Sequence, residues 1–276
     1  MLDSDSGSIS SDSYLSPGYT GKEVAALLNS FHLHSLSEIG DKELMSRFDT
    51  KYLVPLHCLP QFLRHIRGEY SVLSIDQQCV FDYETEYFDT SGFSHYRQHH
   101  NGASPRLKVR CRTYVNSGKS FLELKRKDNK GRTEKSRVDI ADKALLSPTW
   151  LSDRLHAISQ GDSQHEALLP RVLIKYKRVA LMSRKFNERV TIDFLLRAER
   201  ADGTAGMALE QMAVVEVKQG RVNRQSPAVS TLTQLRIRST AFSKYCIACA
   251  VLYPDQIKSN RFKKTLLHLQ PYLTLH

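Results

Sequence analysis

A chain of 276 residues with 41% hydrophobic and 25% charged residues has the composition of a soluble globular protein. Its longest apolar runs, such as residues 245–253, are too short to cross a bilayer as a helix, and the N-terminus has no secretory signal pattern. The net charge of +11 predicts an anionic partner, which is a nucleic acid, an anionic membrane surface or a phosphate-rich small molecule.

The five cysteines and the missing signal segment predict reduced thiols and a cytoplasmic protein, and the short apolar runs predict no transmembrane segment. The number of cysteines is odd and their spacing gives no disulfide framework. Cys246 and Cys249 form a C-x-x-C pair inside an apolar run that we interpret as a strand. We expect both in the core, with zinc binding or redox use as a minor alternative.

The remaining sequence predicts strands in hairpin succession with helices between them. Residues 1–20 are rich in Ser, Asp and Gly, so we expect a disordered tail followed by a single domain over 21–276. Turn sequences at 116–118 and 128–131 predict hairpin loops. Such a pattern indicates an α+β fold with one antiparallel sheet, either a sandwich or a barrel. In chain order we predict a helix at 22–33, a strand at 46–54, a helix at 57–67, strands at 70–75, 79–89, 105–115, 119–128 and 132–140, a helix at 148–160, strands at 171–183, 188–197 and 212–219, a helix at 227–240 and a strand at 243–252.

Five of the predicted strands have one apolar face and one charged face, because side chains alternate along a strand. An ordinary antiparallel sheet with its charged face in water has the same pattern. Consecutive cations on one face repel one another, however, unless a polyanion lies among them. If the predicted helices cover the apolar face from outside, the sheet becomes a barrel with a cationic lumen. The charged faces contain Arg106, Lys108, Arg110 and Arg112; Glu123, Lys125 and Lys127; Lys135, Arg137 and Asp139; Arg189, Thr191 and Asp193; and Glu216 and Lys218.

Carboxylates on these faces have two interpretations. Glu123, Asp193 and Glu216 are either ion-pair partners of the cations or ligands of Mg²⁺ or Mn²⁺, which prefer oxygen ligands and need only one or two from the protein.

The stretch 117–120 resembles the end of a phosphate-binding loop, but it lacks the first glycine and we assign it to a hairpin turn. We expect the pair His99-His100 to be exposed in a loop.

At these same strands the sequence resembles the polyphosphate polymerase domain of the vacuolar transporter chaperone (VTC) family, within the triphosphate tunnel metalloenzyme superfamily. The motifs follow in family order over roughly residues 40–252. They are RFDTKYLV (47–54), YFDT (87–90) with Tyr96, VRCRTY (109–114), LELKRK (122–127), EKSRV (134–138), YKRVA (176–180), RVTID (189–193), VVEVK (214–218) and FSKY (242–245).

The resemblance implies an antiparallel tunnel barrel that transfers the ATP γ-phosphate to a polyphosphate chain with Mn²⁺ or Mg²⁺. Together with the charged faces, it leads us to assign Glu216 to the metal. We assign catalytic roles to Lys51, Arg110, Arg112, Lys125 and Lys244. We assign substrate binding to Lys108, Glu123, Lys127, Lys135, Arg137, Arg178, Arg189, Lys218 and Ser243.

The sequence departs from the hydrolytic branch of this superfamily at its first strand. That branch has Glu-x-Glu-x-Lys, whereas this chain has Arg47-x-Asp49-x-Lys51. Because a cation replaces one carboxylate, the site shifts from metal binding towards phosphate binding, which favours the VTC branch.

Three functions remain from the sequence. The first is a polyphosphate polymerase whose partners are ATP and polyphosphate. The alternatives are a triphosphatase on the same barrel, and a module that binds polyphosphate or inositol polyphosphates without turnover. Nucleic acid is the weaker expectation, because the basic faces have few aromatic residues for base stacking. The sequence assigns no oligomeric state.

Overall fold

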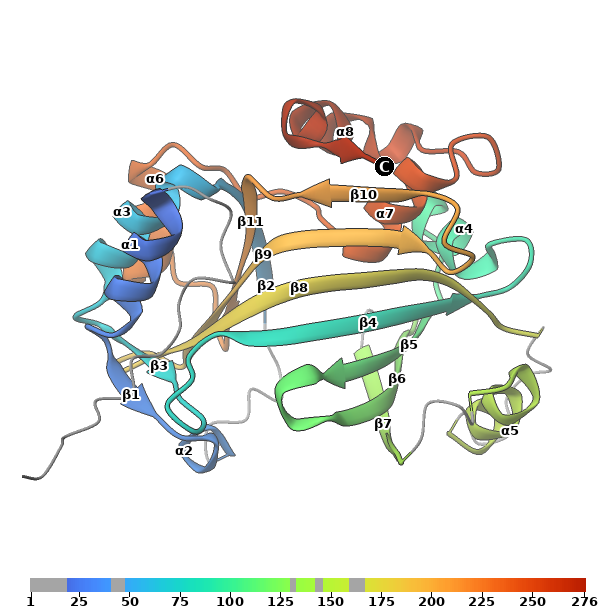
Figure 1. Ribbon diagram of the computed structural model, residues 1–276, viewed down its shortest axis with the longest axis horizontal. Coiled ribbons are helices and arrows are strands. Elements are labelled where there is room, and N and C mark those ends of the chain that lie inside the picture. The colour runs from blue at the N-terminus through green and yellow to red at the C-terminus, as the bar shows by residue number, and fades with distance from the viewer. Residues whose placement is uncertain (1–18, 41–47, 130–132, 142–145, 159–166) are drawn as a thin grey trace, which may run out of the picture.

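The computed structural model describes residues 19–40, 48–129, 133–141, 146–158 and 167–276 (Figure 1). Most of the predicted tail therefore lies outside the described residues, as do Arg47 and the second half of the turn predicted at 128–131.

A mainly antiparallel sheet forms the body of the protein (Figure 1). One path through it runs β2–β11–β9–β8–β4–β5–β6–β7, and each pair along it is antiparallel. Outside this path, β10 pairs with β9 and β12 pairs with β10, while β3 pairs with β8 and, in parallel, with β1. The strands are β1 (His32–His34), β2 (Phe48–Pro55), β3 (Tyr70–Leu73), β4 (Phe81–Asp89), β5 (Arg106–Tyr114), β6 (Lys119–Lys127), β7 (Thr133–Ile140), β8 (Leu169–Ser183), β9 (Glu188–Arg200), β10 (Gly206–Leu209), β11 (Met212–Gln219) and β12 (Thr274–Leu275).

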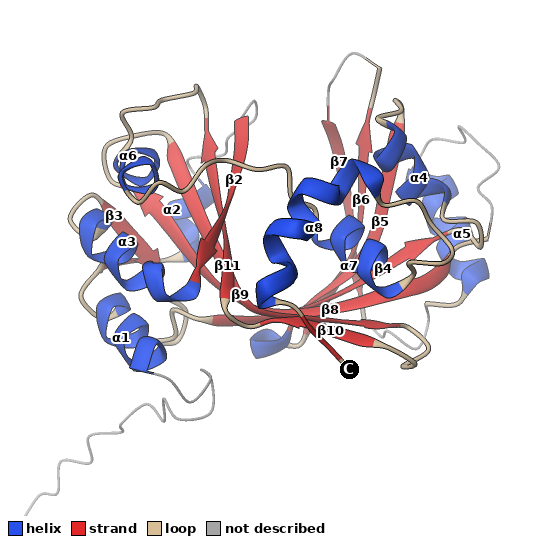
Figure 2. Ribbon diagram, turned by 90° about the horizontal axis from the view of Figure 1, so that it is seen from above, coloured by secondary structure: helices blue, strands red, loops and turns tan. Residues whose placement is uncertain are grey.

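The sheet curls into a trough, with β2 and β11 forming one wall and β5, β6 and β7 the other (Figure 2). The predicted antiparallel sheet is confirmed, whereas closure into a barrel is not seen in the described part of the chain. There, β7 pairs with β6 alone. The outer edge of β2 bonds to the segment that precedes α7, because Tyr52 bridges Ser239 and the N–H of Thr240 donates to the Lys51 carbonyl at 2.8 Å.

Helices cover the apolar, convex face of the trough, as the sequence predicted. Under α1 (Tyr19–Leu28), α3 (Leu59–Ile66) and α6 (Pro227–Gln234), one core cluster contains Phe62, Ile66 and residues of β2, β8, β9 and β11. Each fully buried side chain of this size contributes about 1.5–3 kcal/mol. Under α5 (Pro148–Ile158), a smaller cluster contains Leu151 and residues of β4, β5, β6 and β7. The short helix α2 (Leu36–Gly40) follows β1.

Two of the predicted helices end early. The helix α6 ends at Gln234 rather than 240, because Arg236 has a φ of 59°, which a right-handed helix cannot continue. The helix α1 ends at Leu28 rather than 33, and the chain enters β1 instead.

The concave side of the trough holds a second helical layer that the sequence did not predict (Figure 2). It consists of α4 (Ser94–Asn101), α7 (Lys244–Leu252) and α8 (Lys263–Leu269). One-turn 3₁₀ helices lie elsewhere along the chain, at Leu56–Cys58, Val115–Ser117, Asn260–Phe262 and Gln270–Tyr272. Among the described residues, none of these helices has the length and apolarity needed to span a membrane.

The prediction of a strand at 243–252 is therefore wrong. This segment is α7, and it is buried on almost all sides, so its sequence is apolar throughout and shows no helical periodicity. A start signal was present: the Ser243 hydroxyl accepts the N–H of Cys246 at 3.3 Å as the helix N-cap. Cys246 and Cys249 lie in the core, as expected.

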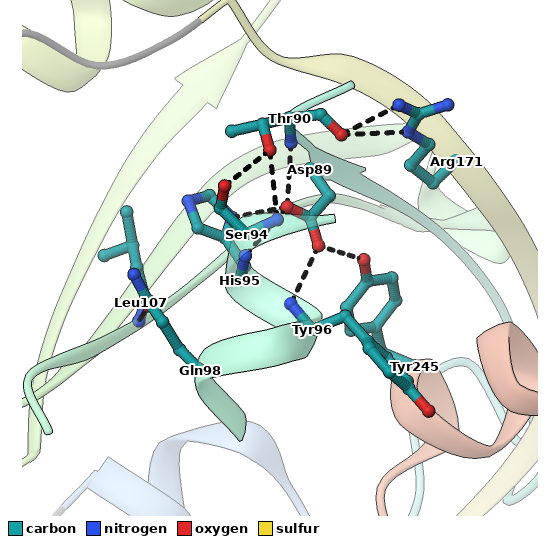
Figure 3. A network of polar contacts seen from close by, with 9 residues as sticks. All are labelled: Asp89, Thr90, Ser94, His95, Tyr96, Gln98, Leu107, Arg171 and Tyr245. Atoms are coloured by element: carbon teal, nitrogen blue, oxygen red, sulfur yellow. Dashed lines mark hydrogen bonds and ion pairs between the residues drawn. The ribbon is translucent and has the colours of Figure 1, made fainter. Parts of the chain in front are cut away.

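A buried carboxylate holds α4 and α7 to the end of β4 (Figure 3). Asp89 is fully buried, and it accepts the backbone N–H groups of Thr90, His95 and Tyr96 at 2.7–2.9 Å. It also accepts the hydroxyl of Tyr245 from α7. Asp89 thus compensates the first N–H groups of α4 and fixes α7 against it.

The prediction that the pair His99-His100 is exposed in a loop is also wrong. Both residues lie on α4, and His100 is buried with its Nε2 at 2.6 Å from the Asn260 Oδ1.

Candidate functional site

The registers of β5, β6 and β7 place their cations in rows on the concave face. Directly opposed residues share a face and lie about 4.5–5.5 Å apart. One row contains only ammonium groups, those of Lys108, Lys125 and Lys135. Opposed like charges destabilise a sheet, and an anion bound along the row offsets that cost. The neighbouring rows are Arg106–Lys127–Thr133, Arg110–Glu123–Arg137 and Arg112–Phe121–Asp139.

The opposite wall presents a second set of charges to the same space. Glu216 opposes Lys51 and Thr191 in one row, and Lys218 opposes Asp49 and Arg189 in the next. On the floor between the walls, Arg178 of β8 opposes Asp193 of β9. We call the space between the two walls the channel.

Charged residues on one wall of the channel change the pKa of residues on the other wall. Partial burial, the ammonium groups of Lys135 and Lys108 beside it, and Lys51 opposite together lower the pKa of Lys125 to about 8. The Lys125 side chain is open to solvent within the channel, so an entering anion reaches it. The lowered pKa of Lys125 therefore reflects both its partial burial and the cations gathered in the channel.

Glu216 lies between two lysines on the β2–β11 wall. Its Oε1 is 3.2 Å from the Lys51 Nζ and its Oε2 is 3.0 Å from the Lys218 Nζ. Burial raises the pKa of this carboxyl, but the ammonium groups of Lys218 and Lys51 outweigh burial and hold the pKa well below its usual range. Glu216 is therefore an ionised oxygen donor that faces the channel.

Asp193 lies deeper and is enclosed by cations. Arg178 grips it with two nitrogens, at 2.5 Å to Oδ1 and 2.7 Å to Oδ2, and Lys244 also donates to Oδ2. Despite burial, which raises the pKa of Asp193, these two cations hold it far below the usual value. Because both oxygens are engaged, Asp193 orients Arg178 and Lys244.

Glu123 is likewise an ion-pair partner. It accepts the Arg110 Nε at 2.7 Å and lies 3.7 Å from the Arg112 Nη1. Burial raises the pKa of Glu123, and the guanidinium groups of Arg110 and Arg112 bring it below its ordinary value. Of the three carboxylates singled out by the sequence, Glu216 alone retains contacts only with lysines, which exchange partners more readily than a bidentate guanidinium.

The N-terminal end of α7 enters the channel. The Lys244 Nζ lies 4.4 Å from the ring centroid of Tyr176, a favourable cation–π distance. The preceding Ser243 accepts the Lys108 Nζ at 3.0 Å. Both residues were predicted site residues, and the structure brings them to the channel from a helix rather than from the predicted strand.

Sequence reasoning missed an aromatic part of the floor. Tyr83 stacks on Tyr176 with ring centroids 5.3 Å apart, and the guanidinium carbon of Arg178 lies 5.0 Å from the Tyr83 centroid. Tyr87 accepts the Arg110 Nη1 at 3.2 Å. The available signal was parity, because Tyr83 and Tyr87 lie on one face of β4, the face that their cross-strand partners Tyr114 and Arg110 share.

Most predicted site residues therefore converge on the channel, from β2, β5, β6, β7, β8, β9, β11 and α7. Lys127 lies towards its margin, in the outermost row. Arg137 opposes Glu123, and its guanidinium carbon lies 3.3 Å from the Phe121 ring centroid. In the described residues, no group of three or more His, Cys, Asp or Glu is placed to hold a metal.

An open groove of about 620 Å³ lies elsewhere, against α8. Its lining is mainly apolar, from Leu266, Leu267 and Leu273, with Lys258 and Lys263 at its edge. We place the candidate site in the channel, because the perturbed ionisable groups gather there.

The sequence matches the family described as the VTC domain over residues 46–253, and the chain belongs to this family. The match begins just before β2 and ends just after α7, so α8 and β12 lie beyond it. Comparison with curated proteins gives no match.

Three solved structures show more distant likeness. A candidate adenylate cyclase from Vibrio parahaemolyticus is 16% identical, covers 73% of this chain and 97% of its own, and has a TM-score of 0.45. A candidate adenylate cyclase from Bacillus halodurans is 13% identical, with 71% and 92% coverage and a TM-score of 0.46. A candidate adenylyl cyclase from Hippeastrum, described as having a dominant triphosphatase activity, is 13% identical, with 75% and 97% coverage and a TM-score of 0.47. At these scores the likenesses carry no argument about activity.

Proposed function

We propose that this protein is a polyphosphate polymerase that transfers the γ-phosphate of ATP to a growing polyphosphate chain in the channel. Membership of the VTC-domain family points to an enzyme that acts on triphosphates. The observation that carries the finer proposal is the row of Lys108, Lys125 and Lys135, which continues the cationic lining beyond the arginines. A triphosphate needs the arginine rows alone, whereas a polymer extends along the additional row.

The arginines have the geometry to orient a triphosphate. Glu123 accepts a hydrogen bond from Arg110, and Asp193 accepts one from Arg178. These carboxylates hold the two guanidinium groups in fixed orientations, so the N–H groups that remain have defined directions. Preorganised guanidinium groups bind phosphate oxygens bidentately and lose little freedom on binding. The ammonium groups of Lys125 and Lys244 add charge without fixing direction.

The donor set around Glu216 fits a divalent metal of the Mg²⁺ or Mn²⁺ type. The carboxylate is ionised and faces the channel, and such ions accept one protein carboxylate when phosphate oxygens and water supply the other ligands. When bound, the metal would neutralise charge on the phosphates of the nucleotide. Glu216 would hold it, in place of its present contacts with Lys51 and Lys218.

The proposed reaction needs no protein nucleophile. An ionised terminal oxygen of the acceptor chain attacks the γ-phosphorus, a new P–O–P bridge forms, and the bond between the γ-phosphorus and the bridging oxygen of ADP breaks, with ADP leaving. No proton has to be removed from the attacking oxygen. The contribution of the residues is therefore alignment and charge compensation. Since the five cysteines are free thiols, a cytoplasmic location is consistent with this proposal.

The test is a product assay with purified protein, ATP and Mn²⁺ or Mg²⁺. We expect ADP together with a polymer that an exopolyphosphatase degrades to orthophosphate. ADP with orthophosphate as the direct product would contradict a polymerase and identify a triphosphatase. Lack of turnover with any divalent metal, combined with retained polyphosphate binding, would identify a binding module.

A further inference from the structure

The segment after α7 lies beyond the family match, yet it is anchored to α4 at one end of the channel. The Tyr96 hydroxyl donates to the Lys258 carbonyl at 2.8 Å, and the His100 ring is 2.6 Å from the Asn260 side chain. The buried ring of Phe262 lies 5.9 Å from the Tyr96 centroid in an edge-on contact. Two anchors, Asn260 and Phe262, thus flank Arg261 on either side.

Arg261 is directed towards α4 rather than away from the protein. A Cβ atom added at Gly102, the residue after α4, would lie 2.8 Å from the Arg261 Nη1. The guanidinium group therefore occupies the space that this glycine leaves open. Within the described part of the chain, no carboxylate pairs with Arg261.

The cations at this end of the channel have a common neighbour in His99. Phe262 stacks against the His99 ring with centroids 6.1 Å apart. Burial, together with the charges of Lys108, Arg106 and Arg261, lowers the pKa of His99 to about 3. His99 is therefore a neutral ring among cations, and its Nδ1 is buried without a hydrogen-bond partner in the described structure.

The outermost row of the channel begins on β5 beside α4, because the N–H of Leu107, the residue after Arg106, donates to the Gln98 Oε1 at 3.4 Å. Arg106 is directly opposite Lys127, and the described residues contain no carboxylate paired with Arg106. Arg106 is four residues from Arg110 along β5, which corresponds to roughly 14 Å at the rise of an antiparallel strand. An anion held at Arg110 does not span that distance unless it is longer than a triphosphate.

We propose that Arg106 and Arg261, with Lys127 opposite Arg106, form an anion subsite at the α4 end of the channel, beyond the row of Lys108, Lys125 and Lys135. Its ligand is the distal part of a linear polyphosphate whose other end lies at Arg110 and Arg178. The identity of this ligand rests on the proposed function, but the subsite itself requires only binding and no turnover. Arg261 belongs to the C-terminal segment, so this segment contributes a residue that selects for chain length.

The experiment compares tripolyphosphate with a long-chain polyphosphate by equilibrium binding to the full chain without ATP. The variants are Arg261→Gln and, as a matched control from the same segment, Lys263→Gln, whose side chain lies at the α8 groove. We expect Arg261→Gln to weaken binding of the long chain about tenfold, the effect of one lost charge-assisted contact, and to leave tripolyphosphate binding within about twofold. Lys263→Gln should change neither affinity beyond about twofold.

Equal weakening for both probes would overturn the subsite, since Arg261 would then act on the whole channel. Unchanged affinity of Arg261→Gln for the long chain, or the same loss in Lys263→Gln, would also overturn it. Thermal melting of each variant checks that the C-terminal segment remains docked. If the wild-type protein makes no polymer but the length-dependent loss is present, the polymerase proposal fails and the subsite stands.

Discussion

Asp193 offers the most direct test of the charge balance in the channel. The change is Asp193→Asn, which preserves shape but removes the charge that pairs with Arg178 and Lys244. Removing one partner of a buried ion pair costs about 3–5 kcal/mol. The two cations are partly open to the channel, so we take the lower end, about 3 kcal/mol. That loss lowers Tm by about 6 °C in a chain of this size.

The same change should strengthen the response to a polyanion. In the wild-type protein, Asp193 competes with phosphate for Arg178 and Lys244, and in the variant that competition is gone. Tripolyphosphate should therefore raise the Tm of the variant by more than it raises that of the wild-type protein, because tighter binding to the folded state adds stability. Turnover should fall, since the two cations lose the group that orients them.

The assay is thermal melting with and without tripolyphosphate, with Glu210→Gln as a control. Glu210 pairs with Arg197 at an exposed site, where such a pair contributes about 0–1 kcal/mol. Glu210→Gln should melt close to the wild-type protein and show the same ligand response. If Asp193→Asn melts like the wild type, or if tripolyphosphate shifts both proteins equally, the proposed balance of charges is wrong.

Three further predictions concern single groups. Tripolyphosphate affinity should decline as pH rises through about 8, where Lys125 loses its proton, and Lys125→Arg should remove the bend in a plot of affinity against pH. The contribution of Lys125 to the free energy of unfolding should instead rise between pH about 8 and 10.5, because in this range the unfolded chain binds more protons than the folded one. Glu216→Gln should abolish metal-dependent turnover and retain or strengthen polyphosphate binding, and a variant that turns over normally would exclude Glu216 as the metal ligand. Tyr245→Phe removes the hydroxyl donated to Asp89, so we expect a loss of about 1 kcal/mol in urea unfolding and a lower kcat through displaced Lys244, with unchanged kcat and stability speaking against this coupling.

The alternation of residues along the strands determined much of the site. In β5, the sequence RLKVRCR places its cations on one face and Leu107, Val109 and Cys111 on the other, whatever the tertiary arrangement. Such parity is local and survives folding, so Arg110, Arg112 and Lys125 were correctly placed on one surface. The alternation therefore predicted which side chains line one wall of the channel, but it did not predict which wall lies opposite.

The segments that failed were those whose environment is set by distant parts of the chain. The stretch at 243–252 has no periodic pattern because α7 is surrounded by the sheet and by α4, and an apolar run of that length suits a strand or a buried helix equally. His99 and His100 of α4 were predicted to be exposed, because their local sequence does not show that the C-terminal segment packs against them.

The roles of the carboxylates were decided by tertiary structure alone. In the sequence, Glu123, Asp193 and Glu216 share one pattern, a carboxylate among cations on a strand face. The pairing of strands and the entry of Lys244 from α7 enclose Asp193 in an ion-pair cluster, while Glu216 contacts the lysines Lys51 and Lys218 alone. Contacts between groups far apart in the sequence depend on register and on helix docking, and side-chain alternation contains neither.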